Sequence, residues 1–120
     1  MKNGVTEIGS VTPLLFADMF NLTKAVANKR ERSSEIEKSL STPEVFGDTK
    51  KMTALTREYN DIKNTLEIAD RYEATVRAKT EAEKTLNEEA DADLVAMARE
   101  ETARLTADDL RIKAELEAAL

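Results

Sequence analysis

The sequence contains no glycine or proline after Gly47, so residues 48–120 run without a strong helix breaker. The whole chain of 120 residues has three Gly and two Pro, and 35% of its residues are charged while 4% are aromatic. A composition of this kind, dominated by good helix formers, is typical of long helices or coiled coils. We therefore predict an all-α fold in which a few long helices are joined by short connections.

The spacing of apolar residues predicts three long helices, at about 13–40, 49–86 and 92–119. Thr12 and Pro13 supply an N-cap and a proline at the first helical position. In each segment apolar residues recur in steps of three and four, which is the pattern of a helix with one buried face. The positions on these faces are Leu15, Met19, Leu22, Val26, Ile36 and Leu40, then Met52, Leu55, Tyr59, Ile62, Leu66, Ala69, Tyr72, Val76 and Leu86, then Leu94, Ala98, Thr102, Leu105, Ile112, Leu116 and Leu120. Lys29, Ser33 and Asp109 interrupt them.

Two short breaks separate the predicted helices. In the first, Pro43 can start a single helical turn near residues 43–47, and Val45 and Phe46 are apolar enough to plug the end of a bundle. Gly47 permits a positive φ, and Asp48 is a good N-cap for the next helix. These breaks predict an antiparallel three-helix bundle or coiled coil with a short helical turn.

The second break is Asn87–Ala90, and Asp91 is the expected N-cap of the third helix. Residues 1–11 lack periodicity and are expected to form a flexible leader, so that residues 12–120 make a single helical domain. The apolar face continues to Leu120 without a stop signal, and we expect the chain to be a fragment of a longer one.

Composition argues against catalysis. Cysteine and histidine are absent, which excludes thiolate or imidazole metal sites and histidine-based triads. The glycines, at positions 4, 9 and 47, are isolated, so no phosphate-binding loop can form. The longest apolar run, Leu14–Ala17, ends at Asp18 and is too short for a membrane span. We predict no catalytic residue, no metal ligand, no cofactor and no membrane contact.

One basic cluster is the only candidate nucleic-acid surface in the sequence. It contains Lys29, Arg30 and Arg32, with Lys24 and Lys38 nearby, but Glu31, Glu35 and Glu37 interleave with it. Because such mixed charge weakens the attraction to phosphates, no autonomous nucleic-acid binding is expected. The candidate partner contacts are Lys29, Arg30, Arg32 and Phe46, where Phe46 is either a plug of the bundle or an anchor for a partner.

The excess of acidic over basic side chains lies at one end of the chain. The formal net charge is −6, yet residues 1–84 hold 14 basic and 14 acidic side chains. Residues 85–120 hold 4 basic and 10 acidic side chains and therefore account for the whole excess. We predict that the third helix faces solvent or a basic protein partner and avoids nucleic-acid phosphates.

Residues 40–59 read Leu-Ser-Thr-Pro-Glu-Val-Phe-Gly-Asp-Thr-Lys-Lys-Met-Thr-Ala-Leu-Thr-Arg-Glu-Tyr. This stretch resembles the N-terminal helical domain of bacterial class I peptide chain release factors. The acidic segment Asn87–Glu101 is similar to the family's turn before the third helix, in the form closer to the type that reads UAA and UAG. The resemblance covers about residues 20–120.

The resemblance implies a non-catalytic domain of a translation termination factor. In the family this domain docks on the ribosome near the stalk base and is linked to recycling by the class II GTPase release factor. By this resemblance the parent protein would direct stop-codon-dependent peptidyl-tRNA hydrolysis. In the family that reaction depends on a Gly-Gly-Gln motif, which cannot occur here because the chain has no glutamine. A cytoplasmic monomer that is not itself an enzyme is the expectation.

The heptad pattern alone supports a second interpretation. The chain can also be a generic coiled-coil module for protein–protein interaction or oligomerisation. A stable dimer or trimer at micromolar concentration would favour this alternative, whereas a monomer fits a single-chain bundle.

Overall fold

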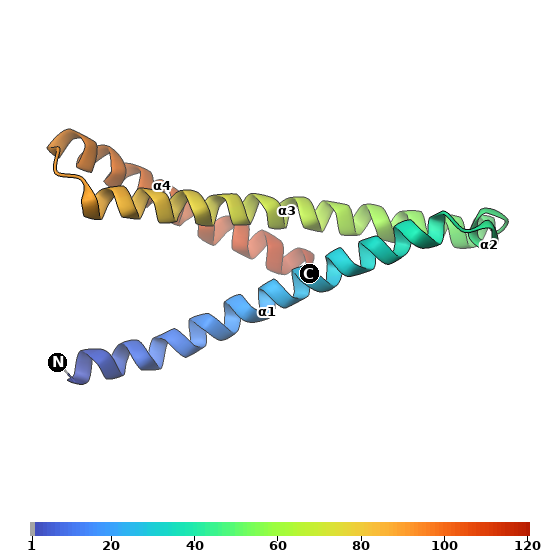
Figure 1. The fold of residues 1–120 in the computed structure, drawn as a ribbon, viewed down its shortest axis with the longest axis horizontal. Helices are drawn as coiled ribbons and strands as arrows, with labels where there is room; N and C mark the ends of the chain where they lie inside the picture. The colour runs from blue at the N-terminus through green and yellow to red at the C-terminus, as the bar shows by residue number, and fades with distance from the viewer. Residues whose placement is uncertain (1) are drawn as a thin grey trace. The chain divides into compact units, whose positions relative to one another are not determined.

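The chain is almost entirely helical. The computed structural model describes the backbone of residues 2–120 and the side chains from residue 19 onward, and this part contains helices and no strand. The helices are α1 (Lys2–Leu40), α2 (Pro43–Phe46), α3 (Thr49–Glu88) and α4 (Ala92–Ala119), shown in Figure 1. The predicted all-α fold, with long helices and a short helical turn after the first, is confirmed.

The first helix begins earlier than the sequence predicts. α1 starts at Lys2 and not at residue 13, which is consistent with glycine at positions 4 and 9 disfavouring a helix without ending it. The predicted face position Leu15 lies outside the residues whose side chains are described. The mobility of residues 1–11 stays a prediction.

The chain divides into two compact units, Met1–Ile62 and Lys63–Leu120, which we name unit 1 and unit 2. Unit 1 contains α1, α2 and the start of α3, and unit 2 contains the rest of α3 and α4. In each unit two long helical segments run in opposite directions and form a hairpin, and in unit 1 the short α2 lies between them (Figure 1). The single domain over residues 12–120 stays a prediction.

The hairpin of unit 1 turns through α2. The side chain of Val45 is buried, whereas Phe46 is 68% exposed. Neighbouring residues on a helix point about 100° apart, so a helix of one turn can direct only one of the two toward α1 and α3. Val45 closes this end of the hairpin, and the prediction that Phe46 also plugs it is wrong.

The backbone around α2 follows the predicted capping. The Asp48 carboxylate accepts a hydrogen bond from the backbone N–H of Lys51, with an N···Oδ1 distance of 3.2 Å. Gly47, however, has φ −80° and ψ −6°, so the positive φ that glycine permits is not used. Its N–H donates to the carbonyl oxygen of Pro43 at 3.0 Å and ends α2 in a right-handed conformation.

The core of each unit lies on the predicted apolar faces. In unit 1 Ile36 is fully buried, and Val26, Ser33, Val45 and Ile62 are also buried. In unit 2 the buried residues are Thr65, Ala69, Ala82, Ala98, Leu105, Ile112 and Leu116. Three predicted face positions, Met19, Leu94 and Leu120, are instead exposed. Met19 and Leu120 lie at the ends of their units away from the connecting turn, whereas Leu94 lies in the first turn of α4, next to the connection with α3.

Two carboxylates shape the turn between α3 and α4. Oε1 of Glu89 accepts hydrogen bonds from the backbone N–H groups of Ala90 and Asp91, at 3.0 and 3.1 Å. Oδ1 of Asp91 accepts from the N–H groups of Asp93 and Leu94, at 2.9 and 3.3 Å. The predicted N-cap at Asp91 is confirmed, and Glu89 adds a second acceptor that lets the chain reverse without glycine.

Candidate functional site

The basic cluster of α1 is partly used inside unit 1. The guanidinium of Arg32 binds the carboxylate of Glu58 on α3 in a bidentate manner, with Nε···Oε2 at 2.7 Å and Nη2···Oε1 at 2.8 Å. A longer contact of 3.4 Å joins Arg32 to Glu35 one turn along α1. This geometry is the strongest form of a carboxylate–arginine pair. Arg32 therefore ties α1 to α3, and a role in partner contact stays a prediction.

The same pair sets the ionisation of Glu58. The hydrogen bonds from Arg32 lower the pKa of this carboxyl below its ordinary value, partial desolvation acts in the opposite direction, and the charge of Lys29 lowers it further. The hydrogen bonds to Glu58 raise the pKa of Arg32 above its ordinary value. About two-fifths of each side chain in the pair is exposed, so water and salt screen the attraction.

A second polar contact joins the same two helices. The hydroxyl of Tyr59 donates to Oε1 of Glu37 at 2.8 Å, and this hydrogen bond raises the pKa of the tyrosine. Tyr59 occupies a predicted face position, but its ring is half-buried and its hydroxyl reaches the surface. Glu37 thus also contributes to holding the hairpin.

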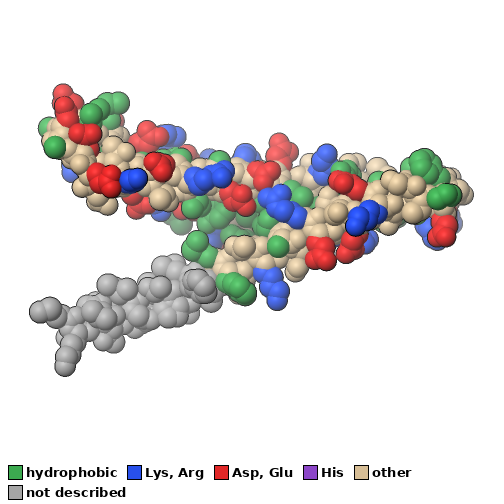
Figure 2. Space-filling model, in the orientation of Figure 1, with side chains coloured by type: hydrophobic (Ala, Val, Ile, Leu, Met, Phe, Trp, Pro, Cys, Tyr) green, Lys and Arg blue, Asp and Glu red, His purple; other side chains and the backbone are tan. Residues whose placement is uncertain are grey.

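The remaining candidate residues lie apart. Lys29 is half-buried on α1 and Arg30 is exposed beside it, while Phe46 lies on α2 at the turn of the hairpin. Figure 2 shows hydrophobic side chains gathered at this end of unit 1. The structure therefore gives an exposed aromatic ring at the turn and cations along α1, and it does not bring them into one cavity.

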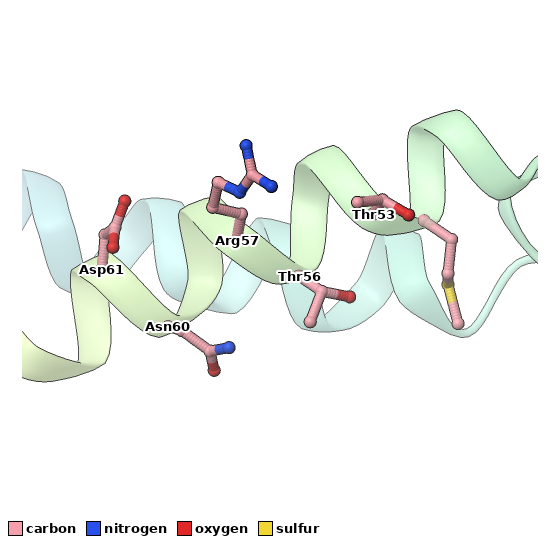
Figure 3. Close-up of a pocket in the computed structure, with 6 residues that line it drawn as sticks. Thr53, Thr56, Arg57, Asn60 and Asp61 are labelled. Atoms are coloured by element: carbon pink, nitrogen blue, oxygen red, sulfur yellow. The ribbon is translucent and has the colours of Figure 1, made fainter.

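A shallow polar surface on α3 was not expected from the sequence. It is lined by Met52, Thr53, Thr56, Arg57, Asn60 and Asp61, all on one helix (Figure 3). Arg57 and Asp61 rise from one side of α3, whereas Thr56 and Asn60 point to the other. These side chains do not converge on a common point, so the surface offers no arrangement for catalysis.

Unit 2 contains a half-buried polar cluster on its apolar face. Oδ2 of Asp109 on α4 lies 3.5 Å from Nζ of Lys79 on α3, and these side chains are 19% and 28% exposed. Tyr72 on α3 also faces Asp109. The pKa of Tyr72 is raised mainly by burial. The negative charge of Asp109 and a hydrogen bond between Tyr72 and Asp109 raise it further. Asp109 can occupy a position on the apolar face because Lys79 and Tyr72 of α3 interact with its carboxylate.

A further ion pair joins the helices of unit 2 at the surface. Nη2 of Arg71 lies 2.8 Å from Oε1 of Glu115. Arg71 also lies four residues after Glu67, a spacing at which two side chains of one helix can pair. The structure shows Arg71 reaching the opposite helix, which spacing along one helix cannot reveal.

The described residues show no metal-binding arrangement. Among their acidic side chains no three gather closely enough to hold a metal ion. Nor does any helix within the described part have the length and apolar character needed to cross a membrane.

Comparison with known proteins identifies one family and relatives that share one name. The PCRF domain family matches residues 29–120. A protein of Levilactobacillus brevis named peptide chain release factor 1 is 27% identical over 103 residues, which is 86% of this chain and 28% of that protein. The protein of the same name from Bacillus mycoides is 30% identical over 102 residues, covering 85% of this chain and 28% of that protein. Over 75 residues, the Enterococcus faecalis protein of this name is 36% identical, covering 62% of this chain and 21% of that protein.

The chain therefore belongs to the PCRF domain family, and the resemblance to release factors seen in residues 40–59 is confirmed. It spans little more than a quarter of the length of the first two of these relatives. No solved structure matches it significantly.

Proposed function

We propose that this chain is the non-catalytic helical domain of a cytoplasmic translation termination factor, and that it docks on the ribosome. The match of the PCRF domain family over residues 29–120 carries this proposal. The relatives that align with most of the chain are named peptide chain release factor 1, and the family's catalytic glutamine motif has no counterpart in a sequence without glutamine. The parent protein would direct stop-codon-dependent hydrolysis of peptidyl-tRNA.

The finer part of the proposal concerns location and partners. By resemblance, the domain reaches the stalk-base region of the ribosome and takes part in recycling by the class II GTPase release factor. The contacts we propose are Lys29, Arg30 and Phe46, because Arg30 and Phe46 are exposed and Lys29 is half-exposed in unit 1. Arg32 contributes through its pair with Glu58, which orders the α1 surface that carries the other two cations.

A domain graft tests the docking role. The matched segment of the Levilactobacillus brevis protein is replaced by this chain, and the graft is compared with the same protein lacking that segment. We expect the graft to bind termination complexes more tightly and to be recycled faster than the shortened protein. Equal affinity and equal recycling for the two would contradict docking.

A release assay tests the non-catalytic role separately. The 120-residue chain is added to ribosomes that carry labelled peptidyl-tRNA at a stop codon. We expect no peptide release above the rate without factor, because the chain lacks the family's glutamine motif. Release by the chain alone would contradict the proposal, whatever the result of the graft.

A further inference from the structure

Unit 2 has a groove beside the turn between α3 and α4. It is lined by Ala78, Glu81, Ala82, Thr85, Leu94, Met97, Ala98 and Glu101. Each helix contributes four residues with the same spacing of three, one and three, which is one face of two successive turns. The groove is therefore about 10 Å long, at about 1.5 Å per residue.

The groove exists because the residues on its floor are small. Ala82 of α3 and Ala98 of α4 are buried there, and alanine leaves room that a larger face residue would fill. On the α4 side, Leu94 is 46% exposed and Met97 is 64% exposed. These two apolar side chains form a wall that nothing in unit 2 covers.

Negative charge surrounds this apolar surface. Glu81 and Glu101 lie on its two helices, and Asp91 and Asp93 come just before Leu94 in the chain. Arg104 pairs with Glu101 at 3.1 Å and compensates part of its charge, but residues 85–120 keep a net charge of −6. Figure 2 shows hydrophobic and acidic side chains next to one another at the end of unit 2 that carries the turn.

We propose that this groove binds a basic amphipathic helix of a partner protein, with one or two of its apolar side chains between Leu94, Met97 and the alanine floor. Lysine or arginine residues of the partner would face the carboxylates at the rim, and Met97 can adjust its shape to the inserted side chain. The proposal goes beyond ribosome docking and does not depend on it.

The chemistry of the groove favours a helix over other occupants. The backbone groups of α3 and α4 are already paired within their helices, so an extended peptide would find no main-chain partners. RNA phosphates and anionic lipids are repelled by the carboxylates. A second copy of this chain would place the same acidic rim against itself.

The probe for the test is a fluorescent synthetic helix of about 14 residues, or about four turns, with leucine on one face and lysine on the other. A second peptide has the same number of lysines and has serine in place of leucine. Fluorescence anisotropy with the complete 120-residue chain should show tighter binding of the leucine peptide. Equal affinities for the two peptides would overturn the proposal, since attraction by charge alone would explain them.

Substitutions in the chain locate the binding site. Met97→Ser should weaken binding of the leucine peptide about tenfold, because it removes a side chain that the complex buries. The matched control is Leu110→Ser, which changes an apolar residue of α4 that is exposed but does not line the groove. Both positions are exposed, and circular dichroism checks that both variants remain helical. An equal loss of affinity in the two variants would overturn the proposal.

The charge argument is tested on the same complex. Glu81→Lys should weaken binding and reduce its dependence on salt, whereas Glu67→Lys, at an exposed position of α3 outside the groove, should change it little. Amide chemical shifts should move at Leu94, Met97 and Ala98 when the leucine peptide is added. The proposal would be overturned if a short RNA shifted the amide signals of the same residues. It would also be overturned if the chain formed a dimer that Met97→Ser abolishes, since a second copy would then occupy the groove.

Discussion

The two units are both helical hairpins, but different interactions hold them. In unit 1 the helices are joined at their surface by Arg32 with Glu58 and by Tyr59 with Glu37, around a core centred on Ile36. In unit 2 a row of buried apolar residues extends along α4 to Leu116, and its inter-helix cluster at Asp109 is half-buried. Only one of the inter-helix contacts described for unit 2, Arg71 with Glu115, is a surface ion pair. Surface ion pairs contribute less than buried apolar area, so unit 1 should depend more on pH and salt.

The largest expected effect comes from the two largest side chains that are fully buried in the described part of the chain. Ile36→Ala in unit 1 and Leu116→Ala in unit 2 each remove a large side chain that is at most 1% exposed. Each should lower the free energy of unfolding by about 2–5 kcal/mol, because a cavity remains. Urea unfolding measures the loss, and hydrogen exchange should locate it in the unit that carries the change. Uniform loss of protection over both units would contradict their separation.

Loss of the N-cap in unit 2 should have a smaller effect. Asp91→Ala removes the carboxylate that accepts from the N–H groups of Asp93 and Leu94. The expected cost is about 1 kcal/mol in urea unfolding. Asp91→Asn is the matched control, since its side-chain oxygen can still accept, and it should cost less. Equal costs for the two variants would contradict the capping role.

A substitution in the turn of unit 1 should have the opposite sign. Gly47→Ala adds a Cβ that meets only the carbonyl oxygen of Pro43, at 3.5 Å, and the backbone already has a φ of −80°. We expect a gain of about 0.4–1 kcal/mol in urea unfolding, because alanine restricts the unfolded chain. A loss of stability would show that Gly47 adopts a positive φ in solution.

Acid should weaken unit 1 through Glu58. Its pKa is lowered in the folded chain, so the folded state binds this proton less readily than the unfolded state. The stabilisation is complete above the ordinary glutamate pKa of 4.5 and is lost as the pH falls through the lowered value. Thermal melts between pH 7 and pH 3 should show a steeper loss for the native chain than for Glu58→Gln. Parallel losses in the two proteins would contradict this role for Glu58.

The smallest expected effect is the shift in the pKa values of two tyrosines. One tyrosine lies in each unit, so their titration compares the two units directly. Both pKa values are raised, that of Tyr59 mainly by its hydrogen bond to Glu37 and that of Tyr72 mainly by burial. Ultraviolet titration should therefore show both ionising above the ordinary value of 10.0. Glu37→Gln should bring Tyr59 back toward that value and leave Tyr72 unchanged. Stability due to the raised values is present below pH 10 and is lost above it.

The sequence predicted the elements better than the contacts between them. Helix periodicity and the capping residues Asp48 and Asp91 are local signals, and both caps appear in the structure. The choice between Val45 and Phe46 depended on which side of a one-turn helix meets α1 and α3, which periodicity cannot show. The partners of Arg32 and Asp109 lie on the opposite helix, at a register that only the folded hairpins define.

The groove of unit 2 was foreseeable in part. Between Val76 and Leu86 the second apolar face has alanine at position 82, and a small residue there indicates space that a larger one would fill. The exposure of Leu94 and Met97 could not be derived in the same way, because it depends on which side chains of α3 share the groove with them, and these include the small residues Ala78 and Ala82.

The central proposal is that unit 1 docks on the ribosome through the cations of α1, while the acidic end of the chain stays away from RNA. A salt series of ribosome binding tests it most directly. The affinity of the 120-residue chain for ribosomes is measured for the native sequence, for Lys29→Glu with Arg30→Glu, and for Glu100→Lys. We predict weaker binding for the first variant, and for the second stronger binding at low salt that converges with the native chain at high salt. Unchanged affinity for both variants at every salt concentration would contradict the account.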